Sequence, residues 1–478
     1  MNRVSLPDNC SLVWLRNDLR LDDNTALAAA AQEGPVVACY LLCPNQWQQH
    51  SMAPIRVDFI LRRLRALCDE LHALNIPMLV RTANSYEDAP AAIGQLIDEL
   101  GIKQLHFNRE YLVDEVRRDL QVEQQLHQRG VRCRSYHDAL VVPPGELKTG
   151  SGSFYKVYSP FRKAWENLVR DSLPDLLPAP SKQQLLGLER EPPPTQLTGW
   201  NLKDSSDWAA EESAAHQRLA EFLQERIEHY KEDRDIPAAP GTSRLSAWFN
   251  IGALSARRAL MEAVATNSGE LGTGSGGAVC WMRELVWREF YYHLVDACPR
   301  IVMGHAFQPH TEAVHWRSSE NDLEAWKTGM TGQPLVDAGM RQLAATGWMH
   351  NRVRMITAMF LSKNLLLDWR LGEQHFMQQL IDGDFALNNG GWQWSASTGT
   401  DAAPYFRVFN PFSQSQRFDA EGTYIKRWVP ELADMAARDL HDSERLSATR
   451  PAHYPQLIVD IKASRKRAIS AFSELNKS

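Results

Sequence analysis

A stretch near the middle of the chain combines indoles, a carboxylate and a guanidinium at helical spacing. The sequence WMRELVWREFYYHL places Trp281, Glu284, Trp287, Arg288 and Tyr291 three or four residues apart, so a helix would carry them on one face. A carboxylate between indoles, with a guanidinium one turn further on, suits a site that stacks flat rings and hydrogen-bonds their edges. An amphipathic helix with a tryptophan pair in the core is the alternative.

Two further segments carry polar groups that could hold a ligand. GWMHNRVRM puts Asn351 and Met355 on one helical face, with Arg354 one residue round. In DGDFALNN, the acidic pair Asp382 and Asp384 could indicate a metal site, but no third ligand lies at metal-binding spacing. We therefore predict no metal, and expect these carboxylates to accept hydrogen bonds from a ribityl chain or a ring N–H.

Hydroxyls gather where a helix is expected to begin, in TSRLS at 242–246. Such a segment can cradle a phosphate with its backbone N–H groups, although a plain helix cap explains it equally well. Neither GxSxG nor HExxH occurs, which argues against hydrolysis by side chains alone.

Tryptophan is concentrated in the second half, where nine of the 15 lie between Trp281 and Trp428. A large aromatic core is the ordinary explanation for most of them. In GGWQW, however, Trp392 and Trp394 follow paired glycines, where a ligand can approach the backbone closely.

The net charge of -6 argues against a protein that coats DNA indiscriminately, because neutralising phosphates needs clustered Lys and Arg. Between residues 341 and 370, however, positive side chains outnumber negative ones. This predicts either a basic face for selective nucleic-acid contact or a solvated helix face. The five cations are Arg341, Arg352, Arg354, Lys363 and Arg370, against Asp368 alone.

Bulk features indicate a globular protein, with 44% hydrophobic residues. Because there is no run of 18 apolar residues and no signal-peptide pattern at the N-terminus, we expect a cytoplasmic protein without membrane contact. The seven cysteines are scattered without a CxxC pair, so we expect reduced, mostly core residues.

The elements that must position these residues fall into two classes. Short β-branched runs at 12–16, 36–42, 77–81, 104–107 and 131–136 alternate with helical patterns, one of them over 54–75. This βαβ series predicts an α/β N-terminal domain with a Rossmann-like parallel sheet, although no GxGxxG follows the first strand.

A Pro- and Leu-rich stretch at 171–194 then suits an extended connection, and 242–430 reads as helices. We predict an α/β domain at 1–140, a linker at 141–208 and an all-α catalytic domain at 209–478.

The motifs LVWLRNDLRLDDNTAL, GTSRLS, TGWMHNRVRM and IDGDFALNNGGWQWSASTGTDAAPYFRVFNP, with the residues at 281–294, closely resemble the photolyase/cryptochrome family over residues 11 to 435. The resemblance implies an antenna pigment in the α/β domain and FAD in the helical one. It implies FAD contacts at Tyr230, Thr242, Ser243, Arg244, Leu245, Ser246, Trp281, Arg288, Arg354, Asp382, Gly383, Asp384 and Asn388.

Within this resemblance, the hydroxyls take the FAD diphosphate, Asp382 pairs with Arg354, and Asn388 faces flavin N5. Reduced FAD, excited by light, donates an electron that splits a cyclobutane dimer flipped out of DNA. Trp392, Trp369 and Trp316 resemble the family's chain for reducing oxidised flavin. Lesion or DNA contacts are implied at Glu284, Trp287, Arg288, Tyr291, Asn351, Arg352, Met355, Trp394 and Gln414.

Members that act on (6-4) photoproducts carry His at the positions of Asn351 and Met355, so the resemblance favours cyclobutane-dimer repair. The alternative is a cryptochrome-type blue-light photoreceptor; Asn388, where plant cryptochromes commonly have Asp, and the short C-terminal tail disfavour it. A light-independent electron-transfer flavoprotein would not need a lesion-facing Glu284. We expect a monomer whose partner is dimer-containing DNA, with no protein partner implied.

For the antenna, His50 and Glu115 match positions that contact the pigment in folate-type members. Asp114 stands where those members have Asn, and Val302 and Met303 replace a Cys-Lys pair. We expect 5,10-methenyltetrahydrofolate first, with a deazaflavin or an empty pocket as alternatives.

Overall fold

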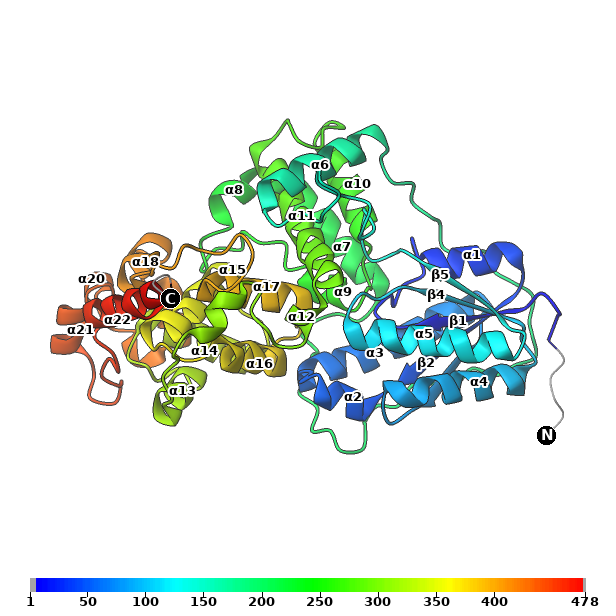
Figure 1. The fold of residues 1–478 in the computed structure, drawn as a ribbon, viewed down its shortest axis with the longest axis horizontal. Coiled ribbons are helices and arrows are strands. Elements are labelled where there is room, and N and C mark those ends of the chain that lie inside the picture. The colour runs from blue at the N-terminus through cyan, green and yellow to red at the C-terminus, as the bar shows by residue number, and fades with distance from the viewer. Residues whose placement is uncertain (1–5, 476–478) are drawn as a thin grey trace. The chain divides into compact units, whose positions relative to one another are not determined.

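The computed structural model describes residues 6–475 and contains two compact units, which are considered separately (Figure 1). Unit 1 combines the strands with several helices, whereas unit 2 is helical. Unit 1 contains the residues up to Tyr155, Ser159–Glu228 and Ser243–Pro299, and unit 2 contains Lys156–Tyr158, His229–Thr242 and the residues from Arg300 onward. The predicted domain boundaries at 140 and 208 remain a proposal.

Unit 1 contains one five-stranded parallel sheet in the order β3-β2-β1-β4-β5, as the βαβ pattern predicted. The central strand β1 and its neighbour β2 are buried along their whole length. Strands covered on both faces are expected to carry nearly continuous apolar runs, as these two do. The strands are β1 (Ser11–Leu15), β2 (Val36–Leu42), β3 (Met78–Thr82), β4 (Gln104–Asn108) and β5 (Arg132–Tyr136).

Helices connect successive strands of this sheet, and further helices complete unit 1. They are α1 (Thr25–Glu33), α2 (Pro44–Gln49), α3 (Pro54–Ala73), α4 (Ala89–Leu100), α5 (Val113–Gln128), α6 (Tyr158–Asp171, whose first residue falls in unit 2), α7 (Glu212–Glu225), α9 (Ser246–Asn250), α10 (Ala256–Thr266) and α11 (Gly276–Ala297).

The predicted linker differs from the structure in one respect, because helix α6 lies inside it. Phe161, Trp165 and Val169 recur every four residues and are all buried, so this segment forms an amphipathic helix. Residues 172–211 are extended and irregular. The backbone of Glu191 donates to Met78 O at the sheet edge (2.8 Å), so part of this connection covers strand β3.

Unit 2 is built from helices, in agreement with the predicted all-α region. They are α8 (Tyr230–Asp233), α12 (Pro299–Val302, whose first residue falls in unit 1), α13 (Glu320–Lys327), α14 (Pro334–Thr346), α15 (Asn351–Met359), α16 (Trp369–Gln379), α17 (Phe385–Ala396), α18 (Pro411–Phe418), α19 (Thr423–Trp428), α20 (Ala437–Leu440), α21 (Ser443–Thr449) and α22 (Ile461–Glu474). A π-helical turn, η4 (Phe360–Asn364), follows α15.

The core of unit 2 contains the fully buried indoles of Trp326, Trp369 and Trp392. The seven cysteines are all free, and four of them are buried. Over residues 6–475, no helix has the length and apolar character needed to cross a membrane.

Candidate functional site

Helix α11 carries the ring-and-carboxylate face that its spacing predicted. Trp281 is buried and packs against Phe222 with ring centroids 5.4 Å apart. Glu284 and Trp287 are half-buried, and Trp287 stacks on Tyr291 at 5.8 Å with an interplanar angle of 28°. Along this face, therefore, an acceptor carboxylate lies next to a preformed pair of stacked rings.

Arg288, on the same helix, is partly used by the fold itself. Its Nη1 donates to Ala139 O at 2.7 Å, and its guanidinium lies 4.8 Å from the centroid of the Tyr292 ring. The neighbouring Glu289, which the sequence patterns did not single out, accepts N–H bonds from Val141, Val142 and the indole of Trp165. Burial nevertheless raises the pKa of Glu289 to about 7.

The segment 242–246 leads into helix α9, which begins at Ser246 as predicted. Arg244 adopts a left-handed backbone conformation (φ 55°), which is unusual for a residue with a side chain and reorients the chain before the helix. Its guanidinium lies over the ring of Trp208 at 5.2 Å, and Leu245 is buried. Thr242, Ser243 and Ser246 are half-buried, and Tyr230 is buried beneath the guanidinium of Arg234.

In unit 2, Arg354 and Asp382 form the predicted ion pair. The Arg354 Nη2 donates to both oxygens of Asp382, at 3.0 and 2.8 Å, and its Nε donates to Met349 O at 2.8 Å. The Asp382 side chain is only 2% exposed, so the carboxylate is buried but neutralised. Asn351 and Met355, on the same helix as Arg354, are exposed and half-buried respectively.

The amide of Asn388 is held in one orientation. Its Nδ2 donates to the backbone oxygen of Glu373 at 3.0 Å. The Oδ1 atom on the other side of the amide is then directed away from Glu373 and can accept a hydrogen bond from a ligand. Asp384 caps the same helix by accepting from Leu387 N at 3.1 Å. Gly383 lies between the two predicted carboxylate contacts.

Behind Asn388 lies a polar network that sequence reasoning missed. Asn389 donates to the Glu373 carboxyl at 2.8 Å, and Gln393 donates to Asn389 Oδ1 at 2.9 Å. Burial raises the pKa of Glu373 to about 7. The only sequence signal for this network is that Asn389 and Gln393 are four residues apart on one helical face.

The three tryptophans of the predicted chain differ in burial. Trp369 and Trp392 are buried, and Trp316 is half-buried. Trp392 packs directly over Gly372. Gly372 lies on α16, three residues after Trp369. One face of α16 therefore carries Trp369 and, a turn later, the contact with Trp392.

The remaining predicted DNA contacts lie on three helices of unit 2. Arg352 on α15 pairs with Asp235 at 2.7 Å and lies over the Phe418 ring at 4.5 Å. Trp394 on α17 and Gln414 on α18 are half-buried.

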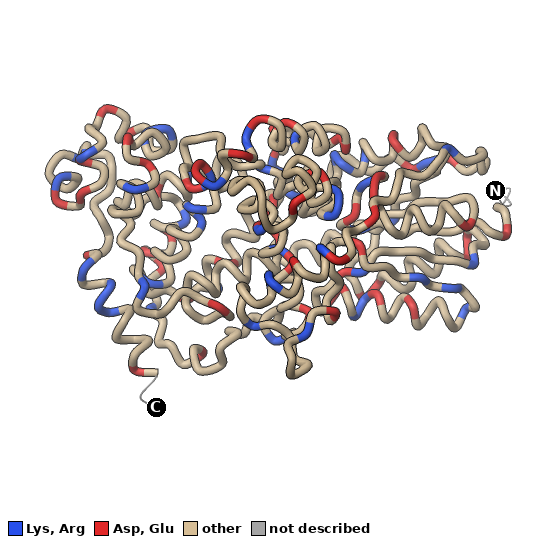
Figure 2. Tube along the Cα trace, turned by 90° about the horizontal axis from the view of Figure 1, so that it is seen from above, with Lys and Arg blue, Asp and Glu red and all other residues tan. Residues whose placement is uncertain are grey.

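The basic face that was one of two predictions for residues 341–370 is not seen as a set of unpaired cations. Lys and Arg lie among Asp and Glu along the traced chain as a whole (Figure 2). Lys363 is fully buried. Each of the four arginines pairs with a carboxylate from another segment of the chain. These pairs are Arg341–Glu431, Arg352–Asp235, Arg354–Asp382 and Arg370–Glu312.

In unit 1, the structure brings the three predicted antenna residues together at helices α2 and α5. His50 Nε2 lies 3.1 Å from Asp114, and His50 Nδ1 lies 3.8 Å from Glu115. Tyr86 OH approaches the same Glu115 oxygen at 3.5 Å. The other oxygen, Glu115 Oε2, is buried without a hydrogen-bond partner among the described residues. Burial, together with the Glu110 carboxylate, raises the pKa of Glu115.

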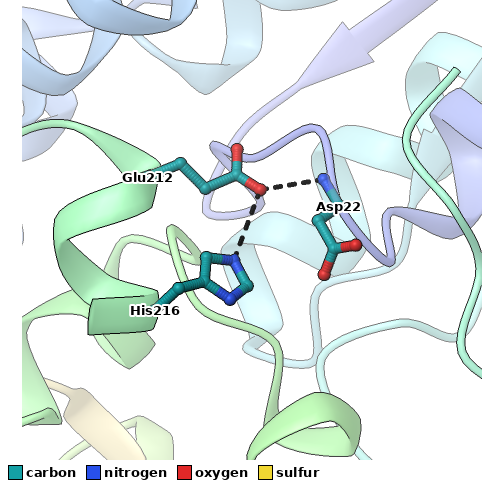
Figure 3. A group of neighbouring side chains, drawn as sticks. All are labelled: Asp22, Glu212 and His216. Carbon is teal, nitrogen blue, oxygen red and sulfur yellow. Dashed lines mark hydrogen bonds and ion pairs between the residues drawn. The ribbon is translucent and has the colours of Figure 1, made fainter. Parts of the chain in front are cut away.

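One group of side chains, Asp22, Glu212 and His216, has the composition of a metal site (Figure 3). Its oxygens are already engaged, however. Glu212 accepts from the backbone N–H groups of Leu21 and Asp22 at 2.7 and 2.9 Å, and Arg258 donates to both oxygens of Asp22. We assign this group to the packing of α7 and do not assign it a metal.

Comparison of the sequence with known proteins identifies two matching families and a similar protein of nearly the same length. The family described as the FAD binding domain of DNA photolyase matches residues 281–474, and the DNA photolyase family matches residues 11–181. A protein of Escherichia coli (strain K12) named deoxyribodipyrimidine photo-lyase is 43% identical over 98% of this chain and 99% of its own length.

Solved structures agree over nearly the whole fold. A class III photolyase from Agrobacterium tumefaciens has a TM-score of 0.85 and 33% identity, covering 99% of both chains. A cryptochrome from Synechocystis sp. PCC6803 has the same TM-score and 28% identity, covering 98% of this chain and 99% of its own. With both family matches and a near full-length relative, this chain belongs to the DNA photolyase family.

Proposed function

We propose that this protein uses absorbed light to split cyclobutane pyrimidine dimers in DNA, with FAD as its cofactor. The near full-length similarity to a deoxyribodipyrimidine photo-lyase carries the proposal. When bound, reduced FAD supplies the light-activated electron that opens the cyclobutane ring and takes that electron back afterwards.

The unit 2 side chains fit a flavin. Because Asn388 Nδ2 is used by Glu373 O, its Oδ1 is the atom available to accept a ring N–H such as flavin N5–H. The pair formed by the half-buried Arg354 and the buried Asp382 adds polar groups without net charge. Tyr230, Thr242, Ser243, Arg244, Leu245, Ser246, Trp281, Arg288, Gly383 and Asp384 are proposed as the remaining FAD contacts.

The lesion would be recognised by rings and one carboxylate. Photolyases act on nucleotides flipped out of the duplex, so the protein must offer stacking surfaces in place of the lost neighbours. Trp287, stacked on Tyr291, supplies one such surface, and Trp394 supplies another. The Glu284 carboxylate would accept a hydrogen bond from a pyrimidine N–H. Asn351, Arg352, Met355 and Gln414 are proposed as further lesion and DNA contacts.

For the outer pigment, we propose 5,10-methenyltetrahydrofolate beside His50, Asp114 and Glu115. The buried Glu115 Oε2 supports this, because an unpartnered carboxylate oxygen calls for an N–H donor, which a pterin ring carries. A near-ultraviolet absorption band separate from the FAD bands of the purified protein would support the folate, and its loss in Glu115→Gln would identify the site. A deazaflavin spectrum or FAD bands alone would contradict it.

A photoreceptor role is the second candidate, favoured by the structural likeness to the Synechocystis cryptochrome. The decisive experiment follows thymine dimers in a synthetic duplex treated with the purified, chemically reduced protein. We expect loss of dimers under blue light and none in the dark. If illuminated and dark samples keep equal dimer content, repair is not the function and light-dependent partner binding becomes the hypothesis to test. Sedimentation of the protein with and without this duplex would test the proposed monomer.

A further inference from the structure

A fully buried lysine lies in unit 2 with no role in the function proposed above. Lys363 belongs to the π-helical turn η4 and is 0% exposed. Its Nζ has no hydrogen-bond partner among residues 6–475 and lies 3.5 Å from the centroid of the Phe472 ring. Leaving an amine unpaired in the interior is costly, and π-helical turns are often found at functional sites.

The ring beneath this amine belongs to an aromatic cluster that includes Trp316. Phe472 meets Trp316 edge-on, with centroids 6.0 Å apart, and stacks on Tyr405 at 6.4 Å with an interplanar angle of 9°. One phenyl ring therefore separates the Lys363 amine from the outermost tryptophan of the predicted chain.

Several of the charged groups around η4 are engaged with other partners. Arg467 on α22 donates to Asn364 O, and Arg317 donates to Leu365 O and pairs with Asp322. Glu373 on α16 accepts from Asn389, while helix α17 carries no charged residue. The other charged or titratable groups on packed elements are Arg352 and Arg354 of α15, which pair with Asp235 and Asp382, Arg370 of α16, which pairs with Asp368 and Glu312, His375 of α16, and Lys462, Arg465, Lys466 and Glu474 of α22.

None of the carboxylates just named forms an ion pair with Lys363. The amine therefore lacks a compensating charge, and burial lowers its pKa to about 7. Both its charged and its neutral forms are accessible at physiological pH.

We propose that Lys363 tunes the outer end of the tryptophan chain through its charge, an inference that rests on the proposed function. With FAD bound, Trp392, Trp369 and Trp316 would pass one electron inward to the oxidised flavin during photoreduction, which would leave one positive charge on Trp316. A dissolved one-electron donor then returns one electron to Trp316. A protonated Lys363 opposes the positive charge left on Trp316, whereas a neutral amine does not. Photoreduction should therefore become faster as the amine loses its proton.

The test measures the rate of flavin photoreduction between about pH 6 and pH 9, with ferrocyanide as a donor that carries no proton. In the wild type we expect a several-fold rise with rising pH. Lys363→Met, an apolar replacement of similar length, should give a fast rate independent of pH. Lys363→Arg, which stays charged, should give a slow rate independent of pH. Equal pH profiles for wild type and Lys363→Met would overturn the proposal.

A second readout does not depend on electron transfer. In protein labelled with 15N-lysine, the Nζ resonance that disappears in Lys363→Met should titrate near neutrality; titration near the ordinary lysine pKa would contradict the proposal. Repair by dithionite-reduced protein bypasses the chain, so wild type and Lys363→Met should repair dimers equally. If neither the wild type nor Lys363→Met repairs dimers, the proposed function is wrong. If both repair dimers but the rate of photoreduction does not depend on pH, only the proposed role of Lys363 is wrong.

Discussion

Helix α11 carries two glutamates five residues apart, Glu284 and Glu289, whose surroundings differ. Glu289 faces inward, where two backbone N–H groups and an indole N–H saturate it and fix residues 141 and 142. Glu284 is half-buried on the same helical face as Trp287. The same helix thus carries one carboxylate whose hydrogen bonds hold the fold together and a second, half-buried one on the face of the Trp287–Tyr291 ring pair.

We expect Glu284→Ala to lower the yield of dimer repair per absorbed photon while FAD stays bound, because the carboxylate would hydrogen-bond the lesion edge. Repair under calibrated blue light and the FAD absorbance of the purified variant are the two measurements. Glu284→Gln, which retains a hydrogen-bonding side chain, serves as the control and should lose less. A variant with wild-type repair yield would remove Glu284 from the lesion site.

Trp394 should contribute affinity and not photochemistry. Its backbone oxygen accepts from Ala403 N at 3.2 Å, which ties the end of α17 to the following loop. Trp394→Ala should weaken binding to dimer-containing DNA by roughly 1–3 kcal/mol, the usual size of a lost base stack. Fluorescence titration against matched damaged and undamaged duplexes measures this, with Trp394→Phe as the ring-retaining control. An unchanged affinity for the damaged duplex would contradict the stacking role.

At the scale of elements, α16 and α17 can approach closely because Gly372 has no side chain. A Cβ at this position would lie 2.1 Å from Trp392 Cη2 and 2.6 Å from Leu361 Cδ2. Both neighbours are buried in the unit 2 core, so neither can move aside freely.

Gly372→Ala should therefore displace the Trp392 indole and cost about 1–3 kcal/mol of stability, the usual cost of overpacking a core. Thermal unfolding and the rate of flavin photoreduction should both change. Gly391→Ala is the matched control, since a Cβ there meets no heavy atom within 4 Å and alanine favours a helix. Equal unfolding midpoints for the wild type and Gly372→Ala would show that the core relaxes around the new methyl group.

The sequence predicted the elements better than their contacts. The five strands form within one or two residues of the predicted runs, because β-branched stretches between turn signals are a local property. Helix α6 was missed inside the linker, and the basic face failed because Asp235, Glu312 and Glu431 come from distant segments. The Gly372–Trp392 contact leaves no local signal either. In contrast, the Arg354–Asp382 pair was predicted through the family resemblance.

At the scale of the molecule, a buried ion network ties the sheet of unit 1 to helix α10. Asp138, after strand β5, pairs with Arg20 at 2.6 Å and with Arg257 at 3.0 Å, and Arg257 also pairs with Asp23. Burial alone would raise the pKa of Asp138, but the two guanidiniums outweigh it and lower the pKa to about 2.

Because the folded pKa lies below the unfolded value of about 3.9, this carboxylate stabilises the protein fully above that pH. The contribution is lost as pH falls toward 2. Asp138→Asn leaves two guanidiniums without their carboxylate and should cost about 3–5 kcal/mol near neutral pH, with a smaller difference from wild type near pH 3. Urea unfolding at both pH values measures this. A loss of equal size at both would show that the charge is not the source of the stability.

The paired arginines between residues 341 and 370 also bear on how such a protein would find its target. A cation already bound to a carboxylate releases few counterions when it meets a phosphate, so we expect Arg341 and Arg370 to add little to the affinity for intact DNA. Undamaged base pairs vastly outnumber lesions in a genome, and every encounter with them occupies a repair enzyme. We expect internal neutralisation to shorten each of those visits, which would leave more of the search time for sampling new stretches of the chromosome.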